Sequence, residues 1–156
     1  MPVRTVSVVL AILIASIGLS AADDPLVGTW KLNLSKSKYS PGPPPRSRVL
    51  KIEPVGSNGF RLINDGVLAN GEKTHVEETF IQDGKDHPLT DSPNADTQVN
   101  RQIDPYTTET INKKGGKTVQ VLRRVVSKDG KAMTITVKGT TASGAPLDDV
   151  RVFDKQ

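Results

Sequence analysis

The sequence predicts an all-β domain built of antiparallel strands, and three observations lead to this fold class. No segment after residue 22 repeats apolar side chains at the three- and four-residue spacing of a helix. Short segments rich in Val, Ile and Thr instead alternate with Gly, Asn, Asp and Pro, which favour turns. About ten such segments follow one another closely, as in a series of antiparallel hairpins.

The first 22 residues differ from the rest of the chain and have the pattern of a secretory signal peptide. Arg4 supplies a positive charge, residues 6–19 carry none, and residues 20–22 are small enough for signal peptidase. We therefore expect cleavage near Ala22, a single domain over residues 23–156, and a secreted or periplasmic protein. A membrane anchor is the alternative, but this uncharged stretch is short for a bilayer, which needs about 20 apolar residues.

Most predicted strands are separated by turns that their own residues explain. Asn70-Gly71, Asp83-Gly84, Gly115-Gly116 and Asp129-Gly130 supply the positive φ angles that tight hairpins need. Asp65-Gly66 falls inside the third strand and predicts a bulge or an extra turn there. We expect strands near residues 26–33, 47–53, 59–69, 72–82, 85–89, 96–103, 106–112, 117–126, 131–139 and 147–154.

A Pro-rich loop over residues 35–47 separates the first two predicted strands. It contains Pro41-Gly-Pro-Pro-Pro45, which favours an extended and solvated connection. A docking segment for a polyproline-binding partner is the alternative, although a stiff loop is the commoner role in a single secreted domain.

Composition excludes several classes of function. The 156-residue chain has no cysteine, which rules out disulfides and thiol catalysis, and two histidines do not suit a structural zinc site. The formal net charge is +4, or +3 without Arg4, and no long basic run indicates nucleic-acid binding. We expect no metal, no cofactor and no nucleic-acid partner. After cleavage we expect a monomer without a stable membrane anchor.

Alternation along two strands predicts which side chains face inward. In residues 117–126 the more apolar face is predicted to point inward, and it carries Arg123 with Val119, Val121 and Val125. Leu122 and Val126 favour the opposite assignment. An inward Arg123 requires a partner: it either reaches water or an internal carboxylate, which alternation alone favours, or it awaits an anionic ligand. In the next strand the expected inward residues are Met133, Ile135 and Val137.

Two segments carry motifs of a known β-barrel family. Leu26-Val-Gly-Thr-Trp-Lys-Leu32 contains a Gly-x-Trp unit, formed by Gly28 and Trp30, and residues 128–137 with 149–155 form a terminal hairpin pattern. Together they resemble the calycin superfamily of lipocalins and fatty-acid-binding proteins, and the chain looks like secreted bacterial lipocalin-like proteins of undefined role. The resemblance implies a single antiparallel up-and-down β-barrel of about eight to ten strands, with Gly28 and Trp30 at its base.

The same resemblance implies a ligand site in the terminal hairpin. The family pattern there is Arg-x-Tyr, and this chain has Arg151-Val152-Phe153, whose phenylalanine cannot donate a hydrogen bond. Sequential hairpins would place Arg123 and Arg151 two strands apart, about 10 Å at about 4.8 Å per strand, so that one carboxylate fits between them. The expected ligand-binding residues are therefore Arg123, Arg151 and Phe153. This arrangement turns Val150 and Val152 outward. In the alternative arrangement Val150 and Val152 face inward and Arg151 is a solvated surface residue.

No catalytic constellation stands out in the sequence. His75 and His87 are isolated in the sequence. His75 and Glu77 would share a strand face and could pair, but exposed strand faces commonly carry such polar residues without any catalytic role. There is no nucleophile elbow and no phosphate-binding glycine loop. A calcium loop would need a defined spacing that is not matched by Asp91, Asn94 and Asp96. We expect a protein that is not an enzyme.

Two functions remain as hypotheses. The first is a secreted barrel that binds a small, largely apolar, fatty-acid-like ligand, which carries a carboxylate if the arginines face inward. The second is a cavity-less β-domain that serves protein interaction or envelope stress. The fatty-acid-binding family has a helical lid where this chain has the Pro-rich loop. A cavity of several hundred cubic ångströms would favour the first hypothesis.

Overall fold

The computed structural model describes residues 24–90 and 92–156, so the predicted signal peptide lies outside the described residues. None of the described residues belongs to a helix long and apolar enough to cross a bilayer. Apart from one short 3-10 helix, η2 (Leu34–Lys36), the regular elements of the described chain are strands. Their bounds are β1 Gly28–Leu32, β2 Ser47–Val55, β3 Gly59–Val67, β4 Lys73–Ile81, β5 Asp86–Pro88, β6 Thr97–Asp104, β7 Thr107–Lys114, β8 Lys117–Val126, β9 Ala132–Thr140 and β10 Pro146–Lys155.

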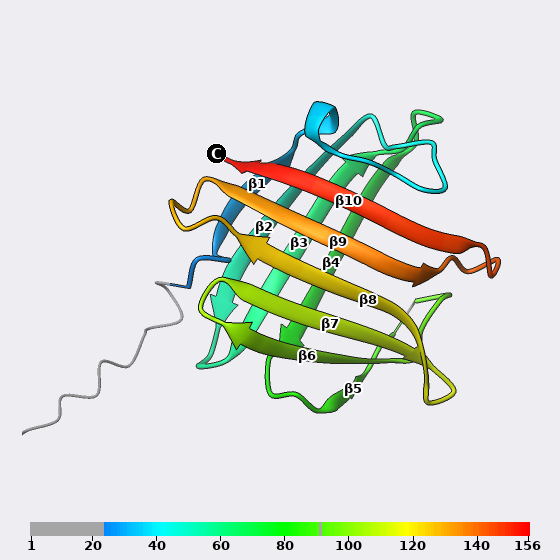
Figure 1. Cartoon of the computed structure of the whole chain (residues 1–156). Coiled ribbons are helices and arrows are strands. Elements are labelled where there is room, and N and C mark those ends of the chain that lie inside the picture. The colour runs from blue at the N-terminus through cyan, green and yellow to red at the C-terminus, as the bar shows by residue number, and fades with distance from the viewer. Residues whose placement is uncertain (1–23, 91) are drawn as a thin grey trace, which may run out of the picture.

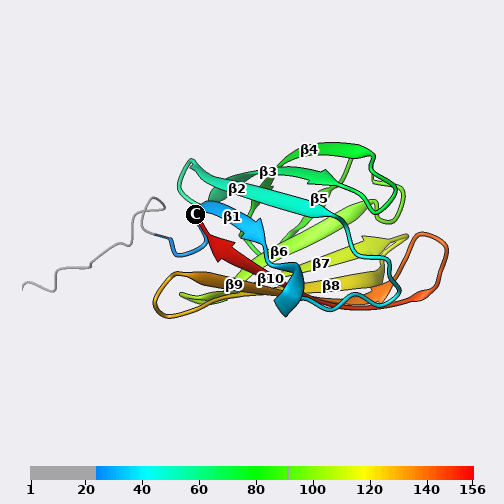
Figure 2. The same cartoon turned by 90° about the horizontal axis from the view of Figure 1, so that it is seen from above.

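All these strands belong to one antiparallel sheet that curls into a half-barrel (Figure 1). The strand order is β4-β3-β2-β1-β10-β9-β8-β7-β6-β5, so consecutive strands pair with each other except β4 and β5, which are the two edges of the sheet. The first strand pairs with the last. In that closing pair Trp30 faces Lys155 and Leu32 faces Phe153. Figure 2 shows the two layers of the curled sheet, with β2 to β4 on one side, β6 to β9 on the other, and β1 and β10 joining them. The prediction of an all-β, up-and-down antiparallel fold is confirmed.

The hairpin turns have the backbone that their glycines predict. Gly71, Gly84, Gly116 and Gly130 have φ angles of 91°, 72°, 75° and 69°. The predicted bulge or turn at Asp65-Gly66 is wrong, because both residues continue the register of β3 with β2 and β4. Gly66 serves a different purpose. A Cβ there would lie 3.1 Å from Thr74 Oγ1 and 3.2 Å from Ser47 O, so the glycine allows close approach of neighbouring chain segments.

One apolar core fills the end of the half-barrel where β1 begins. Trp30 is fully buried, and its indole N–H donates to the Leu26 carbonyl over 2.9 Å, so the ring is both packed and satisfied. The inward prediction for β9 is confirmed, since its three alternate apolar side chains are buried in this core. The cluster consists of Leu26, Trp30, Leu32, Leu50, Ile52, Phe60, Leu62, Phe80, Val126, Met133, Ile135, Val137 and Phe153.

The Pro-rich segment is not the fully solvated connection that its composition predicts. Lys38 forms an antiparallel bridge with Val150, and Asp148 N donates to the Ser40 carbonyl over 2.8 Å. Pro45 is buried and Tyr39 packs against the core. Residues 37–40 therefore lie along β10, where they satisfy backbone groups of the edge that β1 is too short to cover.

Candidate ligand-binding site

The concave face of the sheet has an apolar wall and a polar wall. The apolar wall comprises β1 to β4 with β9 and β10, which supply nearly all of the core cluster. The polar wall comprises β6 to β8, and β6 and β7 add no residue to that cluster. The buried side chains of the polar wall include Gln98, Asn100, Thr108, Thr110 and Arg124.

The arginine that faces inward on β8 is Arg124, and the prediction that Arg123 does so is wrong. Arg123 is exposed and Val125 is 40 % exposed, whereas Arg124 is only 9 % exposed. Leu122 packs against the core and Val126 is buried in it, so the larger apolar contact decides the face of the strand. Arg124 takes the position that was expected for Arg123, two strands away from Arg151. Arg151 of β10 pairs with Ile135 of β9, and Ile135 pairs with Arg124 of β8.

Arg124 is held by contacts within the polar wall. Its Nη1 donates to Thr110 Oγ1 over 2.7 Å, and its guanidinium carbon lies 6.0 Å from the centre of the Phe80 ring. Burial lowers the pKa of Arg124 from its ordinary value, the carboxylate of Glu78 opposes this shift, and the charge of Arg151 adds to it.

Arg151 and Phe153 both lie on the inward face of β10, together with Asp149. Arg151 donates to Asp149 Oδ2 through Nε at 3.1 Å and Nη2 at 2.7 Å, while Ser40 N donates to Asp149 Oδ1 over 2.9 Å. Phe153 is 1 % exposed. The outward Val150 and Val152 are half-exposed, and their backbone groups pair with Lys38 and Asn33 of the segment that follows β1.

A cleft of about 430 Å³ opens beside Arg151 at the mouth of the half-barrel. Arg48 of β2 lies on its wall, on the same face as the buried Leu50. Burial lowers the pKa of Arg48, and the charge of Arg151 lowers it further. Two buried polar atoms at this cleft, Arg48 Nε and the Tyr39 hydroxyl, have no hydrogen-bond partner within the described residues. The lining consists of Tyr39, Pro43, Pro45, Arg48, Leu68, Ala69, Asn70 and Arg151.

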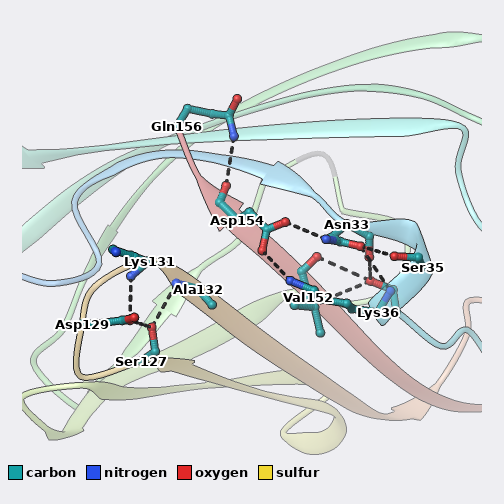
Figure 3. Close-up of polar contacts among 11 residues, drawn as sticks. Asn33, Ser35, Lys36, Ser127, Asp129, Lys131, Ala132, Val152, Asp154 and Gln156 are labelled. Carbon is teal, nitrogen blue, oxygen red and sulfur yellow. Dashed lines mark hydrogen bonds and ion pairs between the residues drawn. The ribbon is translucent and has the colours of Figure 1, made fainter.

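The segment that carries Tyr39 is fastened to β10 by polar contacts at its start (Figure 3). Asp154 accepts hydrogen bonds from Asn33 Nδ2 at 2.6 Å and from Lys36 Nζ at 3.3 Å. Val152 N donates to Ser37 Oγ over 2.9 Å. The hydrogen bonds from Asn33 and Lys36 hold the pKa of Asp154 below its ordinary value of 3.8. Tyr39 also lies over the Arg151 guanidinium, whose carbon is 5.6 Å from the ring centre, so the fastened segment forms one wall of the cleft.

Both histidines lie away from this cleft. His75 Nδ1 lies 2.6 Å from Asp65 Oδ1 on an exposed part of the sheet, and its suggested partner Glu77 is bonded to Arg61 instead. His87 Nε2 lies 2.9 Å from Asp83 Oδ1. Among the described residues, no group of three or more His, Cys, Asp or Glu side chains is placed to hold a metal ion.

Sequence reasoning missed three residues of the concave face, and only one of them had a usable signal. Arg48 alternates with Leu50 and Ile52, and this pattern alone could have placed it inward. Asn100 and Thr108 had no such signal, because the apolar residues of their strands, Val99, Ile103 and Ile111, lie on the opposite face.

The comparisons with known proteins establish the fold. No family model matches the chain, and no curated protein does. Among solved structures, a mutant of the fluorescent protein UnaG is 16% identical with a TM-score of 0.62, covering 85% of this chain and 96% of that chain. The Schistosoma mansoni fatty acid binding protein in complex with arachidonic acid is 13% identical with a TM-score of 0.56, covering 86% and 98%. As-p18, an extracellular fatty acid binding protein, is 14% identical with a TM-score of 0.54, covering 85% and 97%.

These matches each cover 85% or 86% of this chain and nearly all of the other chain. The chain therefore has the fold of these proteins, as the resemblance to fatty-acid-binding proteins predicted.

Proposed function

We propose that this protein binds a small, largely apolar molecule with an acidic group, and that Arg48, Arg151 and Tyr39 hold that group at the mouth of the half-barrel. The observation that carries the proposal is a local excess of donors. The buried carboxylate Asp149 is hydrogen-bonded by Arg151, and the nearby donors Arg48 Nε and Tyr39 OH have no partner within the described residues. A buried cation without a partner is costly, and a ligand carboxylate would remove that cost.

The cleft also suits the apolar part of such a ligand. Its volume of about 430 Å³ falls in the usual range for small-molecule sites, and prolines, leucine and alanine line it beside the arginines. A fatty acid bound to a protein of the same fold, the Schistosoma mansoni neighbour, supports a fatty-acid-like ligand here. The tail would lie toward the concave face of the sheet.

Titration with a fluorescent fatty acid tests the proposal. Wild type should bind saturably, and Arg48→Gln should bind at least tenfold more weakly, since a charge-assisted hydrogen bond contributes about 1.5–3 kcal/mol. Tyr39→Phe removes one hydroxyl and should weaken binding severalfold. The control is Arg123→Gln, which removes the same charge from an exposed site and should bind like wild type. Absence of saturable binding, or equal affinity of all four proteins, would refute the proposal.

We also propose that the barrel acts after export. The support is the charge and small-residue pattern of residues 4–22. Intact mass of the exported protein should match a chain that begins within a residue or two of Asp23. Retention of residues 1–19 in that form would contradict export with cleavage.

A further inference from the structure

The polar wall contains a chain of buried hydrogen bonds that is separate from the mouth cleft. Asn100, Thr108 and Thr110 are 3 %, 6 % and 4 % exposed, and they lie on adjacent strands β6 and β7. Asn100 pairs across the sheet with Thr110, and Thr108 pairs with Arg124 of β8. The cluster is therefore compact and faces the concave side of the sheet.

The direction of this chain follows from its first donor. Arginine can only donate, so Thr110 Oγ1 accepts from Arg124 Nη1 over 2.7 Å and must give its own hydrogen elsewhere. It donates to Asn100 Oδ1 over 2.6 Å. The carbonyl of the Asn100 amide is thereby used, and its Nδ2 group is left as the outer end of the chain.

That outer end is an unused donor. Asn100 Nδ2 and Thr108 Oγ1 are both buried, and neither has a hydrogen-bond partner within the described residues. Folded proteins pair nearly all such atoms, and an unpaired one favours any occupant that brings a suitable oxygen. A chain of aligned hydrogen bonds that starts at a cation also strengthens the last donor.

A neutral oxygen suits this position better than a second acid. The negative charge of Glu78 already acts on Arg124. A carbonyl oxygen accepts from Asn100 Nδ2 without bringing a further negative charge to the polar wall.

We propose that Asn100 and Thr108 form a second contact point for the ligand, which recognises a carbonyl oxygen within its apolar chain. This inference rests on the proposed function: the acidic group lies at the mouth, and the polar wall selects an oxo acid over the corresponding unsubstituted fatty acid.

The test compares stearic acid with a set of 18-carbon acids that each carry one oxo group at a different carbon. Each competes with the fluorescent fatty acid for wild-type protein. At least one oxo acid should bind about three- to tenfold more tightly than stearic acid, the range of one net hydrogen bond. If every oxo acid binds no better than stearic acid, the polar wall holds water and the proposal is overturned.

Matched variants locate the preference. Asn100→Asp keeps the size of the side chain and an acceptor for Thr110 but removes the Nδ2 donors, so the ratio of oxo-acid affinity to stearic-acid affinity should fall to about one. Thr108→Val should reduce the preference, and Thr108→Ser, which restores the hydroxyl, should retain it. The Thr108 pair decides the matter if Asn100→Asp does not fold.

Two results separate this proposal from the proposed function. Stearic acid that binds wild type and loses affinity in Arg48→Gln, without any oxo preference, overturns only the role of the polar wall. Failure of every acid to bind overturns both.

Discussion

The two walls of the half-barrel differ in what they bury. The apolar wall buries a continuous cluster that includes Trp30, Met133 and Phe153, all of them almost inaccessible to water. The polar wall buries Asn100, Thr108 and Thr110, and leaves two of their polar atoms unpaired within the described residues. Apolar burial stabilises a fold, whereas unpaired polar burial costs stability. The difference indicates that the apolar wall supplies most of the packing that holds the domain together, whereas the polar wall adds buried donors to those of Arg48 and Arg151 at the mouth.

The largest expected effect is loss of an aromatic side chain from the apolar wall. Phe153→Ala should lower the free energy of unfolding by about 3–5 kcal/mol, because it removes a buried ring and leaves a cavity. Denaturant unfolding measures this. Val125→Ala, at an exposed position of β8, is the control and should change stability by no more than about 0.5 kcal/mol. Equal losses in the two variants would contradict the division into walls.

A smaller loss is expected where the apolar wall carries its ion pair. Arg151→Gln leaves the Asp149 carboxylate buried with only the Ser40 amide as a close donor, and should cost roughly 3 kcal/mol. The double variant with Asp149→Asn removes both charges and should recover part of that loss. If the double variant is as unstable as the sum of the single ones, the pair does not act as a unit.

The polar wall should respond in the opposite direction. Thr108→Val replaces an unpaired buried hydroxyl with a methyl group of similar size, and should raise the stability of the ligand-free protein by about 1 kcal/mol. Thermal unfolding of this variant beside Thr108→Ser checks it. A loss of stability in the valine variant would mean that the hydroxyl has a structural partner.

The smallest expected effect concerns acid. Hydrogen bonds from Asn33 and Lys36 depress the pKa of Asp154 below 3.8, so the folded state binds this proton less readily than the unfolded state. The stabilisation is fully present above pH 3.8 and is lost as pH falls through the lower folded value. Asp154→Asn should therefore show a shallower loss of stability below about pH 4. Asp148→Asn, whose carboxylate has only a 3.8 Å contact with Lys138, serves as control and should keep the wild-type slope.

Much of the fold was predictable, because alternation and turn residues are local signals. The β9 residues Met133, Ile135 and Val137 were assigned correctly since every alternate residue is apolar. On β8 both faces carry apolar residues, and only the packing of Leu122 and Val126 against distant strands decides between Arg123 and Arg124.

The candidate site was harder to predict, because its residues look like those of a solvated strand. Asn100 and Thr108 lie among polar neighbours, and they are buried only because the sheet curls until the opposite wall covers them. Tyr39 is placed by the contacts of the Pro-rich segment with β10, which depend on pairing between residues more than 100 positions apart. Such long-range contacts leave no periodic trace in the sequence.

The central claim is that the mouth of the half-barrel holds an acid in its ionised form, and one measurement tests it directly. Carbon-13 NMR of carboxyl-labelled palmitic acid, bound to wild type, reports the ionisation of that carboxyl as pH is lowered. We expect the bound resonance to keep the carboxylate shift to lower pH than the free acid does, because adjacent arginines lower the pKa of a carboxyl. In Arg48→Gln the bound carboxyl should protonate at higher pH than in wild type, and in Arg123→Gln it should not change. A bound carboxyl that titrates like the free acid in all three proteins would contradict the account.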